Sequence, residues 1–172
     1  MKIENFDRYC NLLEEILNNV RALKQSAAVL LNDEINNKRT KKQFQAIHAQ
    51  YFLYICIEEL GKFILIFKSY PKNFDSLKQL YKTTRWHDEK IGLLVKHIKE
   101  VNLKRGVIRE YPVEGAIKIL RGFKELNIYV DFENGSIVSP ISNRGKDTLQ
   151  NLTKIVTGGI RIAEIEFDNF KI

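Results

Sequence analysis

Apolar and polar positions alternate with a helical period in the first part of the chain. From Phe6 onward, leucine, isoleucine, valine and alanine recur every three or four residues as far as Leu31. That spacing gathers apolar side chains on one face of an α-helix and leaves the other face polar. The pattern stops in the polar stretch Asn32–Arg39. The sequence therefore predicts a long amphipathic first helix.

A second long helix is expected to follow directly. Thr40 and Gln43 have the spacing of a capping box, and Pro71 stands where the helix should end, after about Tyr70. The run Tyr51–Phe67, YFLYICIEELGKFILIF, is apolar on almost every side of such a helix. A helix of this kind is buried on all sides, so we expect it at the centre of a helical bundle.

Further helices are predicted along the chain. Segment Phe74–Tyr81 is a candidate short helix, and Thr84 is a candidate N-cap for the next one. A further helix is expected from near Pro112 to about Leu126. The apolar face of the helix after Thr84 is predicted to consist of Ile91, Leu94, Ile98 and Val101.

A change of pattern follows before the last helix. Asn127–Pro140 reads NIYVDFENGSIVSP, in which Asn134-Gly135 separates two β-rich runs and signals a hairpin. Ser142 is a candidate cap for the closing helix, in which Gly158-Gly159 marks either a kink or a close helix–helix approach. The expected fold is all-α: one domain over residues 1–172, with about five helices in a bundle and a small β-hairpin inserted before the last helix.

Composition and charge limit the domain count, the type of partner and the expected location of the protein. The 172 residues suffice for one domain with a real core, and the net charge of +7 suits a polyanionic partner such as RNA. Cys10 and Cys56 are isolated, which excludes a disulfide framework and cysteine-based metal spacing. The charged N-terminus has no signal-peptide pattern, and the charges within Tyr51–Phe67 argue against a membrane span. We therefore expect a cytoplasmic protein that does not enter a membrane.

The central helix carries charged residues within its apolar run, namely Glu58, Glu59 and Lys62. Glu59 and Lys62 are three residues apart and can pair along the helix. One interpretation is that they form a structural ion pair that reaches partly to solvent. The other is that their face lies opposite His87 and Lys90, so that a carboxylate, an imidazole and two cations share one pocket.

Such a pocket would suit RNA cleavage. A histidine can accept a proton from the ribose 2′-hydroxyl, and cations can neutralise the charge that develops on the phosphate. No metal ion or other cofactor is required. For His87 alone, a simpler role is a backbone contact at the helix start. His48 lies two turns or more from Glu59 and is a weaker candidate, and His97 is expected at the surface.

Other chemistry finds little support in the sequence. It contains no glycine-rich phosphate loop, no GxSxG and no HExxH. Basic residues cluster within Lys38–Lys42 and within Lys99–Arg109. Each cluster is either solvated surface or a set of contacts to phosphate that do not depend on base sequence. The residues expected to contact RNA are Arg39, Lys42, Arg85, Lys104, Arg105 and Arg109.

Three segments, in this order, resemble the AbiV family of phage abortive-infection proteins, a branch of the HEPN superfamily. They are IEELGKFIL (Ile57–Leu65), the H-x-x-K of His87 and Lys90, and the hairpin IYVDFENGSIVSP (Ile128–Pro140). The resemblance implies a helical HEPN bundle that is usually dimeric. It also implies a role in aborting infection by damaging RNA or blocking translation, typically without a metal ion.

By this resemblance the catalytic positions are Glu59, Lys62, His87 and Lys90, and Tyr129 and Asp131 lie on the hairpin at the rim of the site. The implied partners are RNA (ribosomal or transfer RNA), a second copy of the chain, and a phage protein that activates or inhibits it.

The chain departs from one common HEPN pattern. Many HEPN nucleases carry an arginine followed four to six residues later by a histidine, and no arginine here has such a histidine. Lys90 and His97 have the longer spacing, but lysine lacks the planar fork of arginine. Three interpretations stay open: a ribonuclease or translation-blocking toxin, a non-catalytic helical module that binds RNA or protein, and a purely structural set of charges.

Overall fold

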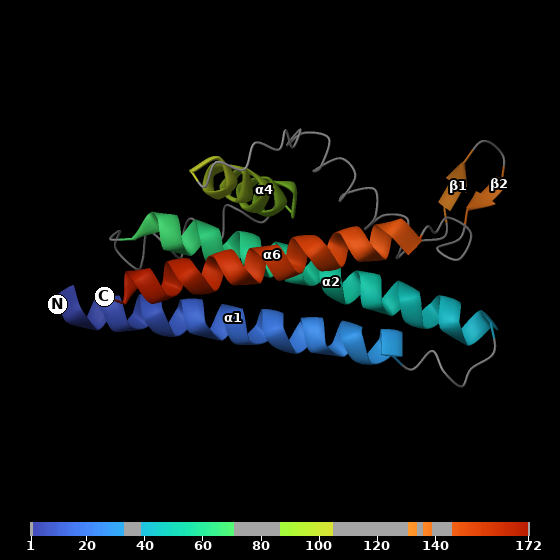
Figure 1. Ribbon diagram of the computed structural model, residues 1–172, viewed down its shortest axis with the longest axis horizontal. Helices are drawn as coiled ribbons and strands as arrows, with labels where there is room; N and C mark the ends of the chain where they lie inside the picture. The colour runs from blue at the N-terminus through green and yellow to red at the C-terminus, as the bar shows by residue number, and fades with distance from the viewer. Residues whose placement is uncertain are drawn as a thin grey trace.

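Four helices make up most of the described part of the protein (Figure 1). The computed structural model describes residues 2–32, 39–70, 87–104, 131–133, 136–138 and 146–171. Figure 1 shows α1, α2 and α6 side by side, with α1 running opposite to the other two, and with the N- and C-terminal ends at the same end of the bundle. The helices are α1 (Lys2–Asn32), α2 (Arg39–Ser69), α4 (His87–Lys104) and α6 (Lys146–Phe170).

The two long predicted helices are confirmed. In α1, Leu13, Leu17 and Val20 are buried, whereas Glu14 and Asn18 between them are exposed, as the helical period requires. Helix α2 packs against α1, α4 and α6, which explains why its sequence is apolar on nearly every side. One detail differs: α2 already includes Arg39, so Thr40 lies inside the helix and is not its cap.

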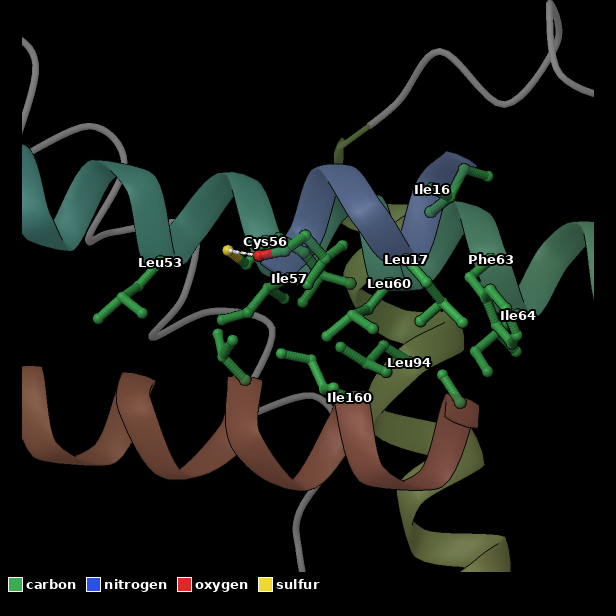
Figure 2. Packing of buried hydrophobic residues seen from close by; sticks show 14 of the residues in the cluster. Ile16, Leu17, Leu53, Cys56, Ile57, Leu60, Phe63, Ile64, Leu94 and Ile160 are labelled. Atoms are coloured by element: carbon green, nitrogen blue, oxygen red, sulfur yellow. Dashed lines mark hydrogen bonds between the residues drawn. The ribbon is translucent and has the colours of Figure 1, made fainter. Parts of the chain in front are cut away.

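The core lies where the four helices meet around α2 (Figure 2). Leu17 of α1, Leu60 of α2, Leu94 of α4 and Ile160 of α6 all contribute to it. Cys56 is fully buried, and its Sγ donates a hydrogen bond to the carbonyl oxygen of Val20 at 3.5 Å. Burial raises the pKa of the Cys56 thiol to about 12, so the thiol stays protonated. Cys56 therefore acts as a small core residue, as predicted.

Two glycines allow neighbouring helices to approach α2 and α6 closely. A Cβ added to Gly61 of α2 would fall on the carbonyl oxygen of Lys90 and within 2.9 Å of the Lys90 Cβ. A Cβ added to Gly159 of α6 would lie 2.8 Å from Cδ1 of the buried Leu60. Helix α6 continues through both of its central glycines, and a Cβ at Gly158 would meet nothing within 4 Å. The glycine pair was expected to mark either a kink or a close approach of helices, and the close approach is confirmed at Gly159.

The expected fold class needs correction. The described residues contain four helices where about five were expected, and they form an all-α bundle. The two strands, β1 (Asp131–Glu133) and β2 (Ser136–Val138), pair antiparallel over three residues each and add no layer to that bundle. The expected helices Phe74–Tyr81 and 112–126, and the expected caps Thr84 and Ser142, lie outside the described residues.

Candidate functional site

The charged centre of α2 lies where α4 crosses it. Because Gly61 has no side chain, the backbone of α4 at Lys90 packs directly against α2. Glu58 precedes Gly61 by nearly one helical turn, and Lys62 follows it directly. From this crossing α4 continues into the core through Ile91, which is fully buried. The fold thus brings the first turn of α4 against the middle of α2.

The charged side chains in the middle of α2, and that of Lys90 on α4, are largely withdrawn from water. Lys62 donates a hydrogen bond from Nζ to Oε1 of Glu59, and these two side chains are only 17% and 13% exposed. Glu58 and Lys90 are each 9% exposed. The predicted Glu59–Lys62 pair is confirmed, and it is more enclosed than a pair that reaches to solvent. Buried charge is tolerated only where it is paired and hydrogen-bonded, so the middle of α2 is a polar centre within an apolar bundle.

The other predicted catalytic residue, His87, is the first residue of α4. It precedes Lys90 by three residues, or about 5 Å along the helix axis. The structure describes the backbone of His87 as helical but does not describe its side chain. His48 of α2 is exposed and does not join the centre. The described residues therefore place the backbone of Lys90 against Gly61, with the His87 position about one turn away along α4. Glu59 lies two residues before Gly61 and therefore on nearly the opposite side of α2.

Those residues predicted to contact RNA that the structure describes lie at or near helix ends. Arg39 opens α2, Lys42 lies in its first turn, and Lys104 closes α4 with an exposed side chain. Asp131, predicted at the rim, begins β1. Outside the described residues lie Arg85, Arg105, Arg109 and Tyr129.

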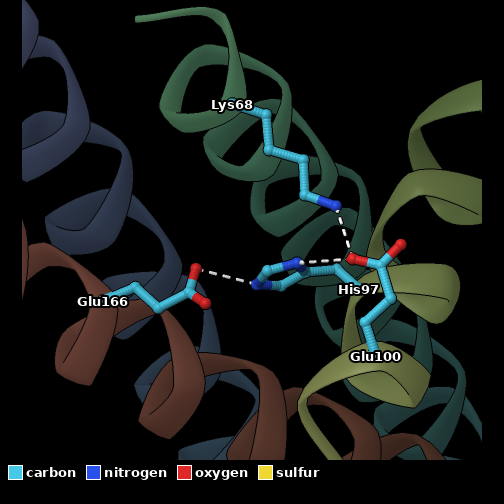
Figure 3. A network of polar contacts seen from close by, with 4 residues as sticks. All are labelled: Lys68, His97, Glu100 and Glu166. Atoms are coloured by element: carbon cyan, nitrogen blue, oxygen red, sulfur yellow. Dashed lines mark hydrogen bonds and ion pairs between the residues drawn. The ribbon is translucent and has the colours of Figure 1, made fainter. Parts of the chain in front are cut away.

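A second polar cluster was missed by the sequence analysis (Figure 3). His97 of α4 is 5% exposed, and its Nε2 lies 2.8 Å from Oε2 of Glu166 on α6. Its Nδ1 lies 3.7 Å from Oε2 of Glu100, and the same oxygen accepts a hydrogen bond from Nζ of Lys68 on α2 at 2.7 Å. These four residues, which we call the His97 cluster, join three helices. The hydrogen bond from Lys68, helped by the charges of Lys68 and His97, lowers the pKa of Glu100.

The prediction that His97 is a surface residue is therefore wrong. The spacing along α4 placed it at the flank of the apolar face, but α6 packs against that flank and covers it. Glu166 follows His97 by 69 residues, and sequence spacing cannot pair residues so far apart. One signal was present: seven residues, or nearly two helical turns, separate the buried Lys90 from His97 and place both on one side of α4.

Two further observations concern membrane spans and metal ligands among the described residues. Among the described helices, none is long and apolar enough to cross a membrane. In residues 2–32, 39–70, 87–104 and 146–171, together with the two strands, no three His, Cys, Asp or Glu side chains are grouped as metal ligands.

Comparison with known proteins gives one match. A family model for AbiV proteins of the HEPN group matches residues 8–161, a span that begins within α1 and ends within α6. Neither the curated proteins nor the solved structures that were compared give a match. The span of the family match includes the α2–α4 crossing and most of the chain. The chain belongs to the AbiV family of HEPN proteins, a family of abortive-infection proteins of phage defence.

Proposed function

We propose that this protein aborts phage infection by cleaving RNA at the α2–α4 crossing, without a metal cofactor, and thereby shuts down translation. The observation that carries the proposal is the enclosed charge on the two helices that meet at this crossing. An acid, Glu59, and two cations, Lys62 and Lys90, lie on the two helices that touch at Gly61. A bundle that needed only stability would place apolar side chains there, since replacing a buried ion pair by packed apolar groups is often neutral or stabilising.

These residues can divide the work of RNA cleavage. His87 would take the proton of the ribose 2′-hydroxyl, whose oxygen then attacks the adjacent phosphorus. Lys62 and Lys90 would stabilise the additional negative charge on the phosphorane. Glu59 holds the ammonium group of Lys62 in place through their ion pair. The bond to the 5′-oxygen breaks, that oxygen gains a proton, and the products are a 2′,3′-cyclic phosphate and a 5′-hydroxyl.

The test is cleavage of RNA in EDTA by the wild-type protein and by His87→Ala. Loss of a group that transfers a proton lowers the rate by about 10²–10⁴-fold, and this is the expected result. His48→Ala is the matched control, because His48 is exposed on α2 and lies outside the crossing. If both variants cut RNA as fast as the wild type, the assignment of His87 is wrong.

A second candidate function is a non-catalytic module that blocks translation by binding RNA or a protein. It is favoured by the sequence, in which no arginine is followed at the usual HEPN spacing by a histidine. In this case RNA binds without products, and the affinity falls steeply as salt rises. Analysis of the RNA after incubation separates the two functions, because only the first yields cyclic-phosphate ends.

The proposal also includes the setting of the activity. The protein would act in the cytoplasm as a homodimer on ribosomal or transfer RNA, under the control of a phage protein that activates or inhibits it. Light scattering on the purified protein tests the dimer, and sequencing of cleaved RNA ends from infected cells identifies the target.

A further inference from the structure

A basic groove runs between α1 and α6, away from the α2–α4 crossing. Its volume is about 390 Å³, and it is open to solvent along the seam where these two helices lie side by side (Figure 1). Arg21, Lys24 and Gln25 of α1 line one wall, and Thr157, Arg161 and Glu164 of α6 line the other. Three cations and one carboxylate leave the groove with a net positive charge.

The arginine on the α1 side is held in a fixed position. Arg21 donates hydrogen bonds from Nε and Nη2 to Oε1 of Glu164, at 3.2 and 2.8 Å, and from Nη1 to Oδ1 of Asn18 at 2.9 Å. A guanidinium has five N–H groups, so these bonds leave two for a ligand. Glu164 thus offsets part of the charge of Arg21 while it orients the guanidinium.

The other two cations of the groove are Lys24 and Arg161. Within the part of the chain that the structure describes, neither Lys24 nor Arg161 forms an ion pair with a carboxylate. Arg161 is exposed, and it precedes Glu164 by three residues, so it lies on the same side of α6 as the Arg21 partner. The groove therefore offers two unneutralised cations and an oriented guanidinium, with the Gln25 amide and the Thr157 hydroxyl as neutral hydrogen-bond donors.

We propose that this α1–α6 groove binds the phosphate backbone of a single RNA strand. Arginine and lysine side chains facing each other across an open channel suit successive phosphates of a chain, because each phosphate can take donors from either wall. The inference rests on the proposed function for its choice of RNA. It assigns to Arg21, Lys24 and Arg161 the role of holding the strand, distinct from the residues proposed to cut it.

The experiment measures binding and not cleavage, so that it is independent of the catalytic assignment. A fluorescent 2′-O-methyl RNA, which lacks the attacking hydroxyl, is titrated with full-length protein at low and high salt. Arg161→Glu is compared with Lys96→Glu, which changes the net charge equally at an exposed lysine of α4 outside the groove. Lys24→Glu serves as a second groove variant, and circular dichroism verifies that each variant folds.

The expected result is a loss of affinity of about tenfold or more for each groove variant, against about twofold for Lys96→Glu. Arg161→Ala should also lower the slope of log affinity against log salt by about 1, as expected for one lost phosphate contact. Equal losses for Arg161→Glu and Lys96→Glu would mean that only overall charge matters, and the groove would be rejected. Competition by AMP as strong as by the RNA would identify a mononucleotide site and overturn the strand proposal.

The two proposals fail separately in these experiments. If His87→Ala still cleaves RNA while Arg161→Glu no longer binds the 2′-O-methyl strand, the catalytic assignment is wrong and the groove stands. If His87→Ala is inactive while the groove variants bind like the wild type, the catalytic assignment stands and the groove is rejected.

Discussion

The two polar clusters of this bundle differ in what holds them together. The Glu59–Lys62 pair lies within one helix, at a spacing of three residues, and can form whenever α2 is helical. The His97 cluster draws its residues from α2, α4 and α6 and exists only when all three helices are packed (Figure 3). This difference suggests a division of work. In the function we propose, the His97 cluster stabilises the assembled bundle, whereas the Glu59–Lys62 pair of α2 serves RNA cleavage.

The largest effect on stability is expected at Gly61, where α2 and α4 cross. In Gly61→Ala the new Cβ falls on the backbone of Lys90, which is not a side chain that can rotate away. Helices α2 and α4 would have to separate, so we expect the free energy of unfolding to fall by about 3 kcal/mol, the upper part of the range for overpacked cores. Urea denaturation of the variant measures this loss.

The matched control for that variant is Gly158→Ala. A Cβ at this exposed position of α6 meets nothing within 4 Å, and alanine is the better helix former. The substitution should therefore stabilise the protein by roughly 0.5–1 kcal/mol. A Gly61→Ala variant as stable as the wild type would show that α4 does not pack on α2 at this glycine.

Next in size is the removal of the imidazole from the second cluster. His97→Ala leaves the partly buried Glu166 carboxylate without its 2.8 Å partner. Hydrogen bonds to charged groups contribute about 1.5–3 kcal/mol, so a loss of about 2 kcal/mol is expected in urea denaturation. RNA cleavage per folded molecule should change little. Cleavage that disappears in a fully folded His97→Ala protein would contradict the division of work between the clusters.

A smaller effect on stability is expected when both charges of the first cluster are neutralised. In the double variant Glu59→Gln, Lys62→Met, side chains of similar length remain and no unpaired charge is left behind. Replacing both partners of a pair is close to neutral, so we expect a change below about 1 kcal/mol. RNA cleavage should nevertheless be lost. A loss of stability as large as that of His97→Ala, with cleavage intact, would mean that the pair is purely structural.

The same contrast explains what could be predicted from the sequence. Helices α1 and α2 and the Glu59–Lys62 pair follow from local spacing, which a single chain displays directly. The His97 cluster depends on α6 packing beside α4, and no local pattern records that arrangement. Gly61 shows the limit of local patterns: it lies within the segment Ile57–Leu65, but its role depends on the backbone of Lys90, which packs against it from another helix.

The smallest expected effect concerns pH and the outer edge of the His97 cluster. The pKa of Glu100 is lowered from its usual 4.5, chiefly by the hydrogen bond from Lys68. A carboxyl group with a lowered pKa stabilises the fold above pH 4.5, and this contribution is lost as the pH falls through the folded-state value. In Lys68→Ala the pKa of Glu100 should return toward 4.5, so the stability difference from the wild type should shrink in acid.

The size of this pH effect is limited by solvent. The Lys68 and Glu100 side chains are 41% and 53% exposed, so the difference at neutral pH should be only a few tenths of a kcal/mol and should decline further with salt. Urea denaturation at neutral pH and below pH 4.5 measures it, with Lys96→Ala, an exposed lysine on the same helix as Glu100, as the control. A difference that persists unchanged in acid would show that Lys68 acts through packing of its aliphatic chain. The polar link from α2 to α4 would then contribute nothing, and the stabilising part of the cluster would reduce to the contact between His97 and Glu166.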